Sequence, residues 1–144
     1  MATDRTANVV WQGDLINGSG TIAEVPSGAF GPLDVSWASR AEEPNGKTSP
    51  EELIAAAWAS CFAMALSNIL AKADHAPEKL ETSATVTFQP GEGITRGMLT
   101  VRGTVPGLDE DGFRELAEDA KKNCPVSQAL TGIPDVSLDA QLAS

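Results

Sequence analysis

The fold is most constrained by a long uncharged segment in the middle of the chain. Ser49 and Pro50 suit the N-cap and the first position of a helix, and Glu52 is spaced to complete a capping box with Ser49. The residues that follow carry no charge until Lys72, and through Leu66 they are apolar or small on every face. Such a helix is expected to be buried all round, by a sheet, another helix or a partner subunit.

Three short strands are expected before this helix. Residues 6–24 alternate small apolar and polar side chains around Asn17-Gly18, a dipeptide that favours tight hairpin turns. Residues 33–39 have the same period of two, with Leu33, Val35 and Trp37 on one face. This third strand should end at Arg40.

A long hairpin, two further helices and a last strand are expected after it. The segments, in chain order, are strands at residues 80–91 and 93–105, an amphipathic helix at 108–123, a short helix at 124–132 and a strand at 133–143. The order of elements predicts one α+β domain over residues 1–144, in which antiparallel β-sheets pack around a long buried central helix.

Charge and termini limit the partners and the compartment. Ten Lys and Arg against twenty Asp and Glu give a formal net charge of −10, which disfavours binding to nucleic acid or to an anionic membrane surface. The N-terminal residues lack the basic and then apolar pattern of a secretory signal. We therefore expect a soluble, cytoplasmic protein.

The reactive residues are few, and the two cysteines are the main candidates. With His75 as the single histidine, the chain offers little material for a metal site, and none is expected. Cys61 and Cys124 are too far apart for a CxxC motif. A free cysteine is often only a small buried hydrophobic residue, so these residues alone leave an inert pair and a reactive pair both open.

The residues that neighbour each cysteine in the sequence favour Cys124 as the thiolate. Cys124 precedes Pro125 at the start of the short helix, with Lys121 and Lys122 close in sequence. Cys61 lies in the uncharged helix with no charged residue within a turn. If Cys61 reacts, its stabilising cation must come from elsewhere, and Arg40 is one candidate.

The longer motifs resemble the osmotically inducible protein C / organic hydroperoxide resistance (OsmC/Ohr) family, and more closely its OsmC branch. They are TSPEELIAAAWASCFAMALS, KKNCPVSQAL, VVWQGDLINGSGTI, VSLDAQL and the pair Ser39–Arg40. The resemblance covers nearly the whole chain. It implies an intertwined homodimer without a cofactor, which reduces organic hydroperoxides and hydrogen peroxide by thiol chemistry and is regenerated by a small dithiol of the lipoyl type.

The resemblance also assigns roles to residues. Cys61 becomes the thiol that attacks peroxide and Cys124 the resolving thiol, which reverses the order that local rules favour. Arg40 becomes the cation that stabilises the Cys61 thiolate, and Glu51 the carboxylate that orients Arg40.

The apolar residues near Cys61 have two interpretations. Phe62, Trp58 and Met64 would form a wall suited to the apolar tail of a hydroperoxide, or they are simply core residues. Trp58 occupies a position where a histidine often stands in the OsmC branch, so no histidine is expected to act at this site.

The spacing along the helix suggests which chain supplies each group. Glu51 and Cys61 are ten residues apart, a rise of about 15 Å along a helix, so their side chains cannot share one cation on a straight helix. We expect Arg40 and Glu51 of one chain to meet Cys61 of the other. Two other functions remain open at this point: a stress-induced protein that binds a lipid-like ligand in its apolar pocket, and a redox sensor without turnover.

Overall fold

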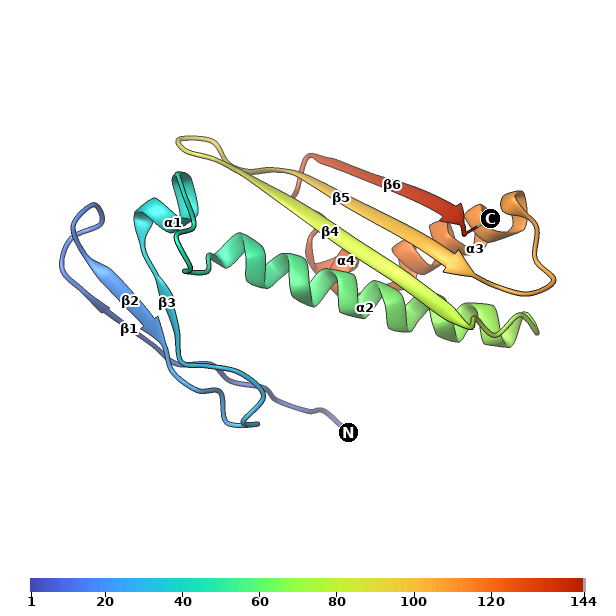
Figure 1. The fold of residues 1–144 in the computed structure, drawn as a ribbon, viewed down its shortest axis with the longest axis horizontal. Helices are drawn as coiled ribbons and strands as arrows, with labels where there is room; N and C mark the ends of the chain where they lie inside the picture. Colours follow the sequence, from blue (N-terminus) through green and yellow to red (C-terminus); the bar gives the residue numbers. More distant parts are fainter. Residues whose placement is uncertain (144) are drawn as a thin grey trace. The chain divides into compact units, whose positions relative to one another are not determined.

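The computed structural model describes residues 1–143, which form two compact units. The division between the units falls between Leu53 and Ile54 in the chain. The elements of the first unit are β1 (Val9–Gln12), β2 (Ser19–Ile22), β3 (Leu33–Val35), α1 (Trp37–Ala41) and the first turn of α2 (Pro50–Lys72). Those of the second unit are the rest of α2, β4 (Lys79–Gln89), β5 (Gly93–Thr104), α3 (Glu110–Asn123), α4 (Pro125–Ala129) and β6 (Asp135–Leu142), all labelled in Figure 1.

The first unit contains the predicted N-terminal hairpin. Strands β1, β2 and β3 form an antiparallel sheet in that order. The β1–β2 connection is closed by Asp14, whose carboxylate accepts the Asn17 N–H (2.7 Å) and whose carbonyl accepts the Gly18 N–H (2.9 Å). Gly13 adopts a positive φ of 92°, which favours glycine. The hairpin around Asn17-Gly18 is therefore confirmed.

The third strand is shorter than the sequence suggests. It ends at Val35, and Trp37 begins the short helix α1, so the prediction of a strand through residue 39 is wrong. The reason is a capping box: the Ser36 hydroxyl accepts the Ser39 N–H (3.0 Å) and the Ser39 hydroxyl accepts the Ser36 N–H (3.0 Å). Arg40 consequently lies in the last turn of a helix and not at a strand end.

Helix α2 begins where the sequence predicts. The Ser49 hydroxyl accepts the Glu52 N–H (3.2 Å), while the Glu52 carboxylate accepts the Thr48 hydroxyl (2.7 Å). The helix is long and apolar enough to cross a membrane by length and composition. The core helix of a soluble protein meets the same criteria, and one side of α2 packs in the core of the second unit.

Only one stripe of α2 is buried in the single chain, which differs from the expected burial on all sides. Trp58, Phe62, Leu66 and Leu70 have no exposed surface, whereas Met64 is 72% exposed. The buried residues recur every fourth position, on the side that the second unit covers with its one sheet. The apolar residues on the other side are exposed or only partly buried in the single chain.

The second unit has the predicted hairpin and one unexpected pairing. Strand β4 pairs with β5 in an antiparallel manner, but β6 pairs with β5 in parallel. The expectation of purely antiparallel sheets is therefore wrong for β6. The chain passes through α3 and α4 between these strands and returns to the end where β5 began, which places β6 parallel to it (Figure 1). The α+β class, with its long central helix, is confirmed.

The core of the second unit lies among α2, the sheet and α3. The fully buried side chains are those of Trp58, Phe62, Leu66, Leu70, Leu99, Phe113, Ala117, Ala120 and Cys124. Gly97 and Gly103 make this packing possible, because a Cβ on either would lie 2.7 Å from a ring carbon of Trp58 or Phe113, respectively.

Candidate active site

The two cysteines lie side by side in the second unit. Cys61 is in the middle of α2 and Cys124 joins α3 to α4; both are free thiols, with 3.0 Å between their sulfurs. Cys124 has no exposed surface, whereas Cys61 is partly exposed. The fold thus joins two thiols that are distant in the sequence, at a separation that a disulfide would close with a small movement.

Cys124 is held by the backbone of two helices. Its N–H donates to the Ala120 carbonyl (2.9 Å) at the end of α3, and its carbonyl accepts the Gln128 N–H (3.0 Å) at the start of α4. Pro125 occupies the first position of α4, which it can do because no N–H is needed there. The sulfur is therefore fixed by backbone geometry.

The protein shifts the pKa values of the two thiols in opposite directions. Burial raises the pKa of Cys61, and its hydrogen bond with Cys124 raises it further. Burial also raises the pKa of Cys124, but hydrogen bonding from Cys61, and then from the N–H and hydroxyl of Ser127, outweighs burial and lowers the pKa of that thiol overall. The lowered pKa of Cys124 agrees with the short-range sequence context, which favours Cys124 as the thiolate.

Arg40 and Glu51 form an ion pair within the first unit. The Arg40 Nε lies 3.0 and 3.2 Å from the two carboxylate oxygens of Glu51, and its Nη2 lies 2.8 Å from Oε2. The Glu51 side chain is 7% exposed and that of Arg40 is 32% exposed. A buried carboxylate that binds Nε and one terminal nitrogen fixes the plane of the guanidinium. Glu51 thus orients Arg40; whether the pair acts on Cys61 stays a prediction.

The three apolar residues predicted near the thiol differ in exposure. Trp58 and Phe62 are fully buried in the core, and Met64 is exposed on the opposite side of α2. In the single chain only Met64 presents a surface, so the predicted wall is not assembled there. Their part in binding a hydroperoxide stays a prediction.

Ser127 is the residue at this site that sequence reasoning missed. Its hydroxyl oxygen accepts the Trp58 indole N–H (2.8 Å), and the same residue influences the Cys124 sulfur. Its position three residues after Cys124 at the start of a helix was the available signal, since that spacing suits a residue that faces an N-cap side chain.

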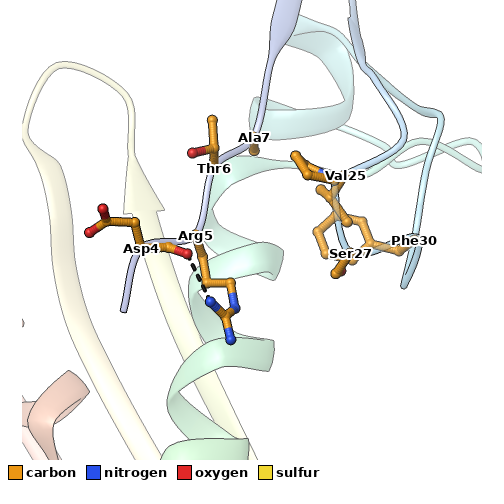
Figure 2. A pocket seen from close by; sticks show the side chains of 8 residues that line it. Asp4, Arg5, Thr6, Ala7, Val25, Ser27 and Phe30 are labelled. Carbon is orange, nitrogen blue, oxygen red and sulfur yellow. Dashed lines mark hydrogen bonds between the residues drawn. The ribbon is translucent and has the colours of Figure 1, made fainter. Parts of the chain in front are cut away.

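Two of the surface pockets lie in different units. One of about 480 Å³ lies beside Ser127, lined by Trp58, Lys121, Lys122, Ser127, Gln128, Leu130, Thr131, Ile133, Pro134 and Val136. The other, of about 620 Å³, is in the first unit between the N-terminal segment and the loop around Ser27 and Phe30 (Figure 2). There the Arg5 guanidinium donates to the Asp4 carbonyl (2.8 Å), and no predicted site residue lines the pocket. Within residues 1–143, no group of three His, Cys, Asp or Glu side chains is placed to hold a metal ion.

Known proteins resemble the chain in both sequence and fold. It is 37% identical to peroxiredoxin OsmC of Escherichia coli strain K12 over 147 aligned residues that cover 100% of both chains. It is 35% identical to an organic hydroperoxide resistance protein of Xanthomonas axonopodis pv. citri over 97 residues, 63% of this chain and 65% of that protein.

The fold is also similar to those of solved structures. An OsmC-like protein of Mycoplasma pneumoniae matches with a TM-score of 0.74 at 15% identity, with 100% of both chains covered. The organic hydroperoxide resistance protein OhrB of Bacillus subtilis matches with a TM-score of 0.65 at 26% identity, with 95% of this chain and 97% of that chain covered. The sequence profile of the family described as OsmC-like protein matches residues 43–139. The chain therefore belongs to the OsmC-like protein family.

Proposed function

We propose that this protein is a thiol-dependent peroxidase that reduces organic hydroperoxides and hydrogen peroxide. The observation that carries the proposal is the pair of free thiols 3.0 Å apart, one partly exposed and one buried. It occurs in a chain that is 37% identical over its full length to a protein named peroxiredoxin OsmC. Relatives named organic hydroperoxide resistance proteins support the same chemistry.

The reaction proceeds in two steps. The Cys61 thiolate attacks one oxygen of the peroxide, the O–O bond breaks, and after protonation an alcohol or water leaves, so that Cys61 becomes a sulfenic acid. The Cys124 thiolate then attacks the Cys61 sulfur and expels hydroxide, which is released as water once protonated, and the Cys61–Cys124 disulfide forms. The buried position of Cys124 beside Cys61 favours this step over further oxidation.

Arg40 and Glu51 supply the charge that Cys61 lacks. Burial raises the pKa of Cys61, so a nearby guanidinium is needed to stabilise its thiolate at neutral pH. Glu51 already holds Arg40 by Nε and Nη2, so the guanidinium is fixed in orientation, and its charge and planar donors suit a thiolate and peroxide oxygens. Because Glu51 and Cys61 lie about 15 Å apart along a helix, we assign Arg40 and Glu51 of one chain to the Cys61 of its partner.

The proposal includes a homodimer in which residues 1–144 act as one domain. The side of α2 that the chain leaves exposed, with Ala56, Ala57 and Met64, supports a partner chain there. In that assembly Met64 would contact the apolar tail of a hydroperoxide, whereas Trp58 and Phe62, which have no exposed surface, would shape the site from the core behind it. A small dithiol of the lipoyl type regenerates the enzyme, and a reducing cytoplasm is the compartment that supplies it.

The test is peroxide consumption in the presence of excess dithiothreitol. Cys61→Ser should abolish consumption of both hydrogen peroxide and cumene hydroperoxide. Cys124→Ser should oxidise once per chain when dithiothreitol is withheld and then stop. The matched control is Ser83→Ala, at an exposed position on β4, which should behave as the unmodified protein does.

Other outcomes separate the competing functions. If peroxide oxidises the thiols but excess dithiol gives no turnover, the protein is a redox sensor. If the thiols do not respond to peroxide and a lipid copurifies, it is a binding protein. Either result would overturn the peroxidase.

A further inference from the structure

The two cysteines differ in exposure in the single chain, and so in how readily an external reductant can approach them. Cys124 has no exposed surface, whereas Cys61 is partly exposed. A thiolate cleaves a disulfide by attacking one sulfur in line with the S–S bond, from the side opposite the sulfur that leaves. An incoming thiol can therefore reach the Cys61 sulfur, while the core residues around Cys124 block attack there.

The surroundings of Cys124 also suit a leaving thiolate. Cys124 is the N-cap residue of α4, but its side chain makes no capping hydrogen bond there. Burial raises the pKa of its thiol, but hydrogen bonding with Cys61, and then with the backbone and hydroxyl of Ser127, lowers that pKa below its ordinary value. Cys61 carries no sulfur-bound hydrogen in the disulfide, so Ser127 is the main group of these that can still stabilise the departing sulfur. A sulfur with a lower thiol pKa leaves faster in thiol–disulfide exchange.

Trp58 holds Ser127 in place. The indole N–H donates to the Ser127 hydroxyl oxygen at 2.8 Å, and the Trp58 ring is fully buried against Gly97, where no side chain larger than hydrogen would fit. Because this oxygen accepts a hydrogen bond from Trp58, the hydroxyl hydrogen is free to turn toward another acceptor. We infer that this acceptor is the sulfur of Cys124, because the Ser127 hydroxyl is among the groups that lower the pKa of that thiol.

We propose that the reductant attacks Cys61, that Cys124 leaves as the thiolate, and that Trp58 and Ser127 are positioning residues which stabilise the departing sulfur. The inference rests on the proposed function, because the disulfide is the intermediate of that reaction. The attacking thiolate forms a bond to the Cys61 sulfur, the Cys61–Cys124 bond breaks, and its electron pair remains on Cys124. The second thiol of the dithiol then attacks the reductant sulfur that is bonded to Cys61. The reductant becomes a cyclic disulfide, and Cys61 leaves as the thiolate.

The site of attack is tested without peroxide. The disulfide is formed with diamide, then mixed with excess 2-mercaptoethanol and iodoacetamide, quenched with acid and mapped by mass spectrometry. Mercaptoethanol should be found on Cys61 and the alkyl group on Cys124, in ~10-fold or greater excess over the reverse arrangement.

The outcomes distinguish this inference from the proposed function. Mercaptoethanol on Cys124, or on both cysteines equally, would overturn the inference and leave the peroxidase intact. If neither diamide nor peroxide forms the disulfide, the peroxidase mechanism fails and the inference fails with it.

The role of Ser127 is tested by substitution. Ser127→Ala should slow cleavage of the preformed disulfide by 2-mercaptoethanol ~3-fold or more, and Ser127→Thr should recover most of the rate because it keeps the hydroxyl. In a Cys61→Ser background, thiolate absorbance should show that Ser127→Ala raises the pKa of Cys124. Trp58→Phe, which keeps a ring and removes the N–H, should act in the same direction.

Gln128→Ala is the matched control. Gln128 lies next to Ser127 on α4 and lines the same pocket, but it donates to the Lys122 carbonyl. It should change neither the rate nor the titration of Cys124. An unchanged titration and an unchanged rate in Ser127→Ala would show that Ser127 does not stabilise the leaving sulfur.

Discussion

The two units carry different groups of the proposed active site. The first unit, residues 1–53, carries the Arg40–Glu51 ion pair between α1 and the first turn of α2, and it contains no cysteine. The second unit carries both thiols in a dense apolar core. The two thiols and the Arg40–Glu51 pair therefore lie in different units.

This difference suggests how a thiol that is fixed in an apolar core could still be activated as a nucleophile. The core that fixes the Cys61–Cys124 geometry also raises the pKa of Cys61, because a low-dielectric environment disfavours the thiolate. An activating cation carried on the same core would itself have to be desolvated. In the proposed dimer Arg40 comes instead from the first unit of the partner chain, where Glu51 already compensates its charge.

The largest effect should come from removing the cation. Arg40→Met should lower kcat/KM for hydroperoxides ~10²–10³-fold, since it removes the charge and the donors that act on the reacting atoms. The measurement is steady-state peroxide consumption with dithiothreitol. Arg96→Met, which breaks an exposed ion pair on β5, is the control and should have little effect.

Mixing variants then tests which chain supplies Arg40. Arg40→Met and Cys61→Ser chains, each inactive alone, should regain about a quarter of the activity when unfolded and refolded together, because half of the dimers pair the two variants and each of these has one complete site. Absence of any recovery, with mixed dimers detected, would show that Arg40 acts on the Cys61 of its own chain.

The stability of the two units should also differ. Phe62→Ala leaves a cavity in the second unit and should cost about 3–5 kcal/mol of unfolding free energy in urea denaturation. Val10→Ala, on the exposed surface of β1, should change it by less than about 0.5 kcal/mol. Equal losses would mean that the stability of the chain does not depend on the core of the second unit.

A smaller effect is expected from the carboxylate that orients Arg40. Glu51→Gln keeps the shape but removes the charge, so Arg40 loses a charge-assisted contact and should act ~10-fold less efficiently in kcat/KM. Glu52→Gln, the exposed neighbour, is the control. If both variants behave alike, the Arg40–Glu51 pair is structural.

The smallest effect concerns the pH profile of Cys61. Burial raises the pKa of this thiol, so in Arg40→Met its alkylation rate should keep rising with pH beyond the ordinary cysteine range. With Arg40 present the rate should level off at lower pH, because the cation favours the thiolate. Identical profiles for the two proteins, followed by mass spectrometry of the Cys61 peptide, would remove Arg40 from the site.

Much of the fold could be predicted from the sequence because local signals were strong. The Ser49 cap, the Asn17-Gly18 turn and the alternation of β4 and β5 each have a short-range cause. The end of β3 was mispredicted because the reciprocal Ser36–Ser39 cap competes with a continuing period of two. The direction of β6 was mispredicted because strand direction depends on where a long connection ends, which no local pattern encodes.

The candidate site was predicted only through the resemblance to a family. Local rules favoured Cys124 as the thiolate, and the pKa directions within the second unit agree with them. Nothing near Cys61 in the sequence indicates a nucleophile. Ser127 escaped notice because its importance depends on the indole of Trp58, which lies 69 residues away in the chain.

The central claim is that Cys61 reacts with peroxide and Cys124 resolves it. The most direct measurement is single-turnover oxidation with hydrogen peroxide and with cumene hydroperoxide, followed by mass spectrometry of both cysteines. We expect a Cys61 sulfenic acid in Cys124→Ser. In the unmodified protein we expect a Cys61–Cys124 disulfide, with one peroxide consumed for each disulfide formed. A sulfenic acid on Cys124 with Cys61 still reduced, or peroxide consumed without oxidation of either thiol, would contradict it.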